Sequence, residues 1–315
     1  MSNKSPDRRT LVAFLLAVFF AGINGIAVRF SNAELPPFFG AGARFFLASV
    51  ILFGIVLARR LPLPRGRSLF GVIIYGILGT GFNYAFLYWA LEYLPAGLSV
   101  TILALTPLLT FLFAWAHRQE AFRWKVPIGS LLALAGILII TFNQLSTHTA
   151  LLPILAVILA AACFAESTVI IKNYPQAHPV TTSAVSLLVG SILLLIFSAI
   201  WGEKLVLPTL LATWASFVYL IIFGSVITFI LILYVIQHWT ASASSYLFVL
   251  MPIVTITVGT WLAHESITLS LLLGGLLVLF GAYIGGIAKP EQLHLFYARL
   301  RTKFKPQVPE CCPET

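Results

Sequence analysis

An acidic side chain within an apolar segment is the strongest chemical signal in this sequence. Glu166 lies in the apolar stretch 154–171 and is followed by Ser167 and Thr168; in a helix it would sit roughly 9 Å from the nearer end, at 1.5 Å per residue. An ionised acid facing lipid at that depth costs about 2.5 kcal/mol or more, so Glu166 should face the protein interior or be protonated. Glu166 could bind a cationic group or carry a coupled proton, or it could be a protonated structural acid. We favour the functional roles, because ionisable residues inside membranes usually serve function.

A basic residue, Arg44, lies in another apolar stretch, 38–58. It could attract a carboxylate or a phosphate from the outer side. It could equally cap helix ends or extend its side chain to the outer headgroups. Arg44 lies in the outer half of its stretch, so we do not expect it to pair directly with Glu166.

A third group consists of polar and aromatic residues spread over several apolar stretches. Tyr84 and Tyr88 would share one helix face, and Trp89 precedes Tyr234 by 145 residues. Such residues suit an amphipathic or aromatic solute, although some could anchor at the membrane interface or bond between helices. The candidates for substrate binding are Asn24, Asn83, Tyr84, Tyr88, Trp89, Glu166, Ser167, Thr168, Tyr234 and Tyr246.

Composition requires that these residues be positioned within a membrane. Of 315 residues, 60% are apolar and 9% are charged, and the mean hydropathy is +0.99; a soluble domain carries roughly 25% charged residues. Continuous apolar runs of this length predict helices, because backbone groups cannot stay unpaired in hydrocarbon. We therefore predict an all-α integral membrane fold of ten transmembrane helices. The expected spans are 11–31, 38–58, 69–91, 96–116, 126–144, 151–171, 180–201, 213–236, 241–262 and 269–288.

The distribution of basic residues predicts the orientation. With the N-terminus inside, the inner loops and tails hold sixteen of the nineteen Lys and Arg residues, and the outer loops hold only Lys204. This asymmetry is the positive-inside pattern and places both termini in the cytoplasm. The net charge of +9 therefore indicates topology rather than nucleic-acid binding. The short outer loops are consistent with a bacterial inner membrane protein.

The second part of the chain repeats the first at an offset of 145 residues. Pro107 matches Pro252, and Glu120 matches Glu265. Five spans in each copy place the copies in opposite orientations, a design that recurs in secondary transporters. The predicted organisation is an N-terminal segment (1–10), two five-helix repeats (11–144 and 151–288) around a central cavity, and a C-terminal tail (289–315).

The repeated residues suggest local roles. Each proline should lie near the middle of a helix, where it would break one hydrogen bond and either shape a central site or serve packing alone. Glu120 and Glu265 should satisfy backbone donors at the start of the next helix. Four glycines that recur at the same offset should permit close helix packing. They are Gly129, Gly136, Gly274 and Gly281.

These motifs resemble the drug/metabolite transporter superfamily, specifically the EamA-type group, over residues 11–288. The segment 20–29 is similar to the family's Trp-Gly-x-Asn opening with Ala21 in place of Trp, and Ala43-Arg44-Phe45 resembles its Arg-Phe step. The proline and glutamate pairs resemble the signatures that close each half. The resemblance implies ten helices with a central cavity, and export or exchange of small metabolites, often amino acids.

Other classes of protein remain as alternatives. A membrane enzyme would need a nucleophile with a base, or a metal cluster, and a receptor or scaffold would not need matched halves. A nucleotide-sugar or sugar-phosphate carrier would need several basic residues in its cavity. We predict no enzyme activity, no cofactor and no metal, with a small-molecule substrate and proton coupling at Glu166 as the hypothesis.

Overall fold

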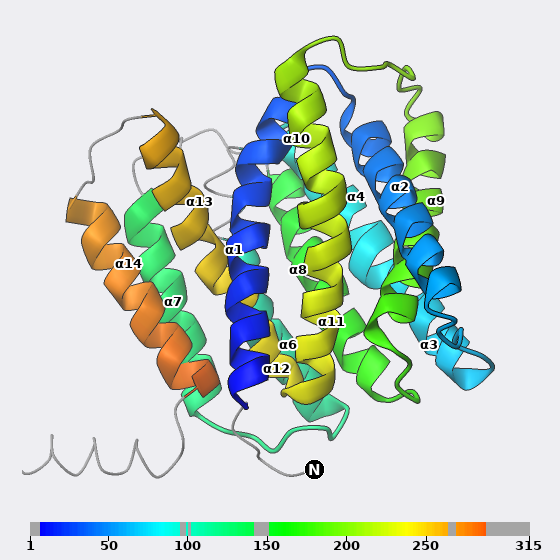
Figure 1. Ribbon diagram of the computed structural model, residues 1–315. Helices are drawn as coiled ribbons and strands as arrows, with labels where there is room; N and C mark the ends of the chain where they lie inside the picture. The colour runs from blue at the N-terminus through cyan, green and yellow to red at the C-terminus, as the bar shows by residue number, and fades with distance from the viewer. Residues whose placement is uncertain (1–6, 95–98, 100–101, 142–150, 264–268, 288–315) are drawn as a thin grey trace, which may run out of the picture.

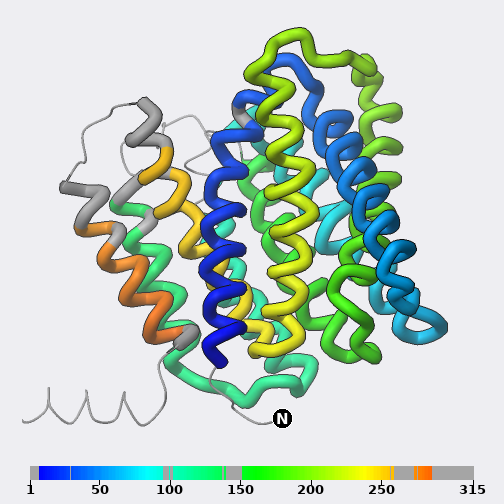
Figure 2. Tube along the Cα trace, in the orientation of Figure 1, coloured from blue at the N-terminus to red at the C-terminus, as the bar shows by residue number. Residues whose placement is uncertain are grey.

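The structure, a computed structural model, describes residues 7–94, 99, 102–141, 151–263 and 269–287 (Figure 1). Within these residues the fold is helical, without strands. Figure 2 traces the same chain as a tube and marks the remaining residues in grey.

The helices fall into two halves of matching order. The first half contains α1 (Arg8–Ser31), α2 (Pro37–Ala58), α3 (Arg67–Tyr75), the π-helix η1 (Gly76–Phe82), α4 (Asn83–Leu91), α6 (Thr106–Ala116) and α7 (Lys125–Thr141). The second half contains α8 (Leu151–Lys172), α9 (Pro179–Ile200), α10 (Leu211–Ile221), the π-helix η3 (Ile222–Ile227), α11 (Thr228–His238), α12 (Ala241–Ser244), α13 (Leu247–Ala263), α14 (Leu269–Ala282) and the π-helix η4 (Tyr283–Ile287).

Local sequence explains where several helices begin and end. Asp7 caps α1 by accepting a hydrogen bond from the Thr10 amide at 2.9 Å, the usual role of an acidic N-cap. Helices α2 and α9 both begin with proline, whose missing N–H would be unpaired there in any case. Past their ends, Arg60 and Gly202 have positive φ angles of 50° and 70°, a backbone conformation that commonly ends a helix.

The outer surface of the bundle is apolar. Among the described residues, six helical stretches are long and apolar enough to cross a membrane: 8–28, 37–58, 67–91, 151–172, 179–200 and 211–238. Shorter apolar helices lie at 106–116, 125–136, 241–255 and 276–285. Large apolar side chains such as Leu57 and Leu276 are 80% and 65% exposed. An apolar exterior on helices of this length defines a multi-pass integral membrane protein.

The two halves pack against each other reciprocally. Helix α1 packs on α10, α11 and α13 of the second half, and α8 packs on η1, α4 and α6 of the first. Equivalent helices also pair directly, α2 with α9 and α7 with α14. These two pairs stand at opposite sides of the bundle (Figure 1). Neither half therefore forms a compact unit without the other.

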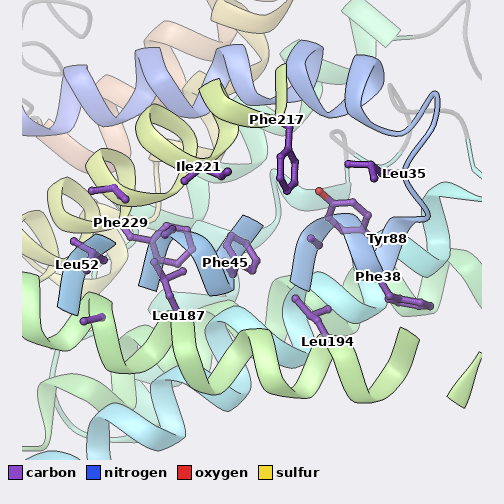
Figure 3. Packing of buried hydrophobic residues seen from close by; sticks show 14 of the residues in the cluster. Leu35, Phe38, Phe45, Leu52, Tyr88, Leu187, Leu194, Phe217, Ile221 and Phe229 are labelled. Carbon is purple, nitrogen blue, oxygen red and sulfur yellow. The ribbon is translucent and has the colours of Figure 1, made fainter. Parts of the chain in front are cut away.

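Large apolar side chains fill the space between α2, α9 and α10–α11. Figure 3 shows Phe45 of α2 packed with Leu187 and Leu194 of α9, and Phe217 of α10 and Phe229 of α11 completing the cluster. The Phe45 and Phe229 rings meet edge to face at 5.6 Å. This cluster fixes the position of α2, which carries Arg44.

Glycines allow α7 and α14 to approach backbone to backbone, as the sequence predicts. A Cβ atom built at Gly281 would lie 2.6 Å from both the Ala133 nitrogen and the Gly129 oxygen. One built at Gly129 would lie equally close to the Gly281 oxygen. Small residues permit this close contact in membrane helices, and here no side chain can be added without moving a backbone.

We expect Gly281→Ala to destabilise the protein by about 1–3 kcal/mol, the usual range for overpacking. The measurement is the thermal unfolding midpoint of purified protein in detergent. Gly54→Ala on α2 is the matched control, since nothing lies within 4 Å of a Cβ built there. Equal midpoints for the two variants would contradict this account of the α7–α14 contact.

A loop carboxylate predicts a specific dependence of stability on pH. Glu34, before α2, accepts hydrogen bonds from the amides of Thr209 (3.2 Å) and Leu210 (3.0 Å) before α10. The hydrogen bond from the Thr209 hydroxyl makes the largest contribution, and together with these amides it lowers the pKa of Glu34 from 4.5 to about 2. Because the pKa of Glu34 is lower in the folded protein, its ionised carboxylate stabilises the folded state above pH 4.5. This stabilisation is lost as the pH falls toward 2 and the carboxylate is protonated.

The difference in unfolding midpoint between wild type and Glu34→Gln should therefore be constant above pH 4.5 and shrink below it. Midpoints measured across a pH series test this expectation. A difference that stays constant down to about pH 2 would exclude Glu34 as the source.

Candidate functional site

Glu166 lies on α8 and pairs with a residue that the sequence did not single out for chemistry. Its Oε1 atom is 2.9 Å from His117 Nε2, just past the end of α6, and the two side chains are 26% and 35% exposed. The structure thus joins an acid of the second half to a histidine of the first. A signal existed in the sequence, since His117 follows an apolar stretch on the expected inner side, where α8 also ends.

Amide side chains extend this pair into a network between α6 and α8. Gln119 Nε2 donates to the Val169 carbonyl and to Asn173 Oδ1, both at 2.8 Å. Asn173 Nδ2 lies 3.5 Å from His117 Nδ1. The end of α6 is therefore held to the C-terminal end of α8 by one ion pair and by amide hydrogen bonds.

Arg44 is at the centre of a second, separate group on α2 and α4. Its side chain is 3% exposed. Its guanidinium carbon lies 4.5 Å from the Phe45 ring centroid, 5.4 Å from that of Tyr84 and 5.9 Å from that of Tyr88. Arg44 does not extend to the surface, and its Nε and Nη1 atoms find no hydrogen-bond partner among the described residues. We call Arg44, Phe45, Tyr84 and Tyr88 the Arg44 cluster.

Asn24 and Ser167 occupy matching places in the two halves, 143 residues apart. Asn24 on α1 donates to the Gly224 carbonyl of η3 at 3.2 Å. Ser167 on α8 lies against Gly79 of η1, where an added Cβ would be 2.5 Å from its Oγ. Each half thus sets a polar side chain of its first helix against a glycine in the π-helix of the other half.

Other candidates serve helix geometry or packing. The hydroxyls of Ser167 and Thr168 donate to the Phe164 carbonyl of their own helix at 2.7 and 3.0 Å. Asn83 is buried where η1 passes into α4. The Tyr246 hydroxyl lies 3.2 Å from the Val126 carbonyl and 3.1 Å from Ser130 Oγ on α7.

Trp89 and Tyr234 are repeat equivalents that face different spaces. Trp89 lines an apolar pocket of about 310 Å³ between α2, α4, α8 and α9. Tyr234 lines a pocket of about 610 Å³ between α1 and α11 that also contains Arg8 and Arg9. Its ring stacks on His238 at 4.1 Å. Neither residue joins the Arg44 cluster or the Glu166–His117 pair.

The expectation that Pro107 lies near the middle of a helix is wrong. Helix α6 begins at Thr106 after a turn at 104–105, so Pro107 occupies the first turn, where no helical hydrogen bond is lost. The Thr106 hydroxyl donates to the Leu103 carbonyl at 2.5 Å. Pro252, in contrast, does lie inside α13.

Glu120 caps a helix, but not the next one in the chain. It accepts hydrogen bonds from the Ser242 amide at 3.1 Å and the Ser242 hydroxyl at 2.6 Å, at the start of α12 in the other half. The expectation that Glu120 caps α7, the next helix in the chain, is therefore wrong. Its expected role, accepting hydrogen bonds from backbone donors at the start of a helix, agrees with the structure. Its equivalent Glu265 lies outside the described residues. Across the described residues, no three His, Cys, Asp or Glu side chains gather as a metal site would require.

Two reciprocally packed helical halves, an apolar exterior and buried polar groups between the halves define a multi-pass membrane protein. The sequence model of the EamA-like transporter family matches residues 8–142 and again 151–285, and the chain belongs to this family. The resemblance drawn from the motifs is thereby confirmed.

Similar proteins carry transporter names. The uncharacterized transporter YvbV of Bacillus subtilis is 27% identical over 279 residues, covering 87% of this chain and 90% of that protein. The probable amino-acid metabolite efflux pump of Escherichia coli K12 is 25% identical over 290 residues, covering 88% and 95%. A solved crystal structure matches the fold with a TM-score of 0.77 at 20% identity, covering 93% of this chain and 98% of that one.

The Tyr246 contacts distinguish a structural role from a substrate-binding role. Tyr246→Phe removes a buried hydroxyl and leaves the Val126 carbonyl without that contact. We expect it to lower stability by about 1 kcal/mol while the apparent KM for a transported solute stays unchanged. Thermal unfolding and transport kinetics on the same preparation check both parts. A raised KM with unchanged stability would instead return Tyr246 to the substrate site.

Proposed function

We propose that this chain is a secondary transporter that exports or exchanges small metabolites, such as amino acids, across the bacterial inner membrane by alternating access. The reciprocal packing of the halves is the observation that carries the proposal. The first helix of each half contacts the third and fourth helical segments of the other. Two similar halves arranged in this way can exchange conformations, which gives inward-open and outward-open states of similar energy.

The membrane arrangement belongs to the same proposal. The six long stretches and the four shorter apolar helices together form ten spans, with two inverted five-helix repeats around a central cavity. Both termini face the cytoplasm, as the basic loops require. The Escherichia coli relative whose name describes an amino-acid metabolite efflux pump supports the substrate class.

Coupling to protons is proposed to occur at the Glu166–His117 pair. The pair bridges the two halves at 2.9 Å, and both of its side chains are of types that can gain or lose a proton. Loss or gain of a proton there alters the attraction between α6 and α8. A change of protonation can therefore favour one arrangement of the halves over the other.

The proposed function is tested by counterflow in proteoliposomes with labelled amino acids, amines, purines and sugars, with and without a pH gradient. We expect exchange of one chemical class and faster exchange with the gradient. Absence of exchange for every compound, by protein shown to be folded, would contradict the proposal.

Glu166→Gln tests the coupling separately from transport. The amide can still accept a hydrogen bond from His117 but cannot release a proton. We expect exchange without a gradient to persist, and its acceleration by the gradient to be lost. Glu92→Gln is the control, because Glu92 is exposed beyond the end of α4. Equal acceleration in wild type and Glu166→Gln, at every pH, would exclude Glu166 as the coupling site.

A further inference from the structure

The structure assigns to Arg44 the recognition of a carboxylate group on the transported solute, with the rest of the solute lying against Phe45, Tyr84 and Tyr88. This assignment rests on the proposed transport function and specifies its substrate class: small monocarboxylates with an apolar or aromatic body, amino acids among them.

Arg44 is a buried cation that has no ion-pair partner within the part of the chain that the structure describes. It is 3% exposed, and arginine is almost never fully buried unless it is paired. The ion pair of the described residues joins His117 to Glu166 and does not include Arg44. Glu203 is an acid that contacts α2, but it is occupied at the start of that helix, where it accepts hydrogen bonds from the amides of Phe38 (3.1 Å) and Phe39 (2.7 Å).

The surrounding rings do not satisfy the guanidinium. Three ring centroids lie within 5.9 Å of its carbon atom, and each contact is a favourable cation–π interaction. Rings accept no in-plane hydrogen bonds, however, and Nε and Nη1 remain without a partner among the described residues. The unfilled requirement is an acceptor for the Nε and Nη1 N–H groups together with a charge that balances the guanidinium, and an anionic oxygen ligand supplies both.

The chemistry of the cluster selects the kind of anion. A carboxylate matches the planar guanidinium and its single charge, whereas a phosphate would call for further cations that the cluster does not contain. The other members of the cluster are buried or partly buried aromatic side chains, whose ring faces suit an apolar body. Phe229 of the second half contacts Phe45 at 5.6 Å, so a solute held here would touch the boundary between the halves.

The experiment measures ligand-induced shifts in the unfolding midpoint of the full-length protein in detergent. Ligand binding to the folded state raises this midpoint. The probes are phenylpropionate, phenylalanine and phenethylamine, which share a ring and differ in the carboxylate and the amine. The variants are Arg44→Met, Arg44→Lys and, as a control on the same helix, Arg59→Met; Arg59 is exposed at the end of α2.

In wild type and Arg59→Met, phenylpropionate and phenylalanine should raise the midpoint and phenethylamine should not. In Arg44→Met both shifts should vanish, while the ligand-free midpoint equals or exceeds that of wild type, because an unpaired buried charge has been removed. A purely structural Arg44 would instead lower the ligand-free midpoint on substitution.

The assignment is overturned if no carboxylate shifts the wild type, if phenethylamine shifts it equally, or if the shifts survive in Arg44→Met. Should Arg44→Met not fold, Arg44→Lys decides the question. This variant keeps the charge and loses the planar pair of donors, so a tenfold or greater loss of affinity supports the assignment and unchanged affinity overturns it.

Counterflow of the same carboxylates separates this assignment from the proposed function. If the midpoint shifts require Arg44 but no counterflow exchange occurs, the binding site is supported and the proposed transport function is contradicted. Exchange that continues at the wild-type rate in Arg44→Met would keep transport and remove the assignment.

Discussion

A polar group within hydrocarbon has to find its partner inside the protein, because lipid offers none. This constraint organises the molecule from helix ends to its centre. Glu120 caps α12 across the boundary between the halves, Tyr246 bonds to α7, and Asn24 bonds to η3. All three contacts join one half to the other. These polar groups therefore find their hydrogen-bond partners only when the two halves assemble. A few buried side chains of the described residues keep polar atoms without such a partner, and Arg44 is the charged one among them, whose donors the proposed carboxylate would fill.

Because the helices of the two halves are arranged reciprocally, this need for polar partners inside the protein is met by equivalent contacts in both halves. Asn24 meets Gly224, and Ser167 meets Gly79, so the same contact is built twice with different residues. Both glycines lie in π-helical segments, where an extra residue per turn widens the helix and commonly marks functional positions. The first helix of each half therefore contacts a π-helical segment of the other half.

The sequence predicted the helical fold, the repeat and the family, because apolar length and the 145-residue spacing of Pro, Glu and Gly are strong signals over many residues. The close packing of Gly129 and Gly281 also followed from spacing. Contacts between distant helices were harder. His117 was not matched to Glu166, because a shared inner side of the membrane does not show which helix ends lie side by side. Pro107 was placed inside a helix, since an apolar run does not show the turn that interrupts it.

The substrate candidates illustrate the same difficulty. Tyr84 and Tyr88 were grouped correctly by their spacing, and the structure adds Arg44 to them. Trp89 and Tyr234 were grouped by repeat equivalence, yet they line separate pockets. Equivalent residues of the two repeats lie in different halves of the protein and need not be close together. Residues four apart on one helix, in contrast, lie on the same face.

The pairing of Asn24 with Gly224 and of Ser167 with Gly79 also bears on the balance between conformations. Identical halves would make the two arrangements of a transporter degenerate, with an equilibrium constant of one. An amide that bonds to the opposing backbone and a hydroxyl that bonds within its own helix remove that degeneracy. Every 1.4 kcal/mol of difference changes the ratio of the two populations about tenfold. The divergence of this residue pair is thus one of the differences between the halves that would separate the two arrangements of the proposed transporter in energy.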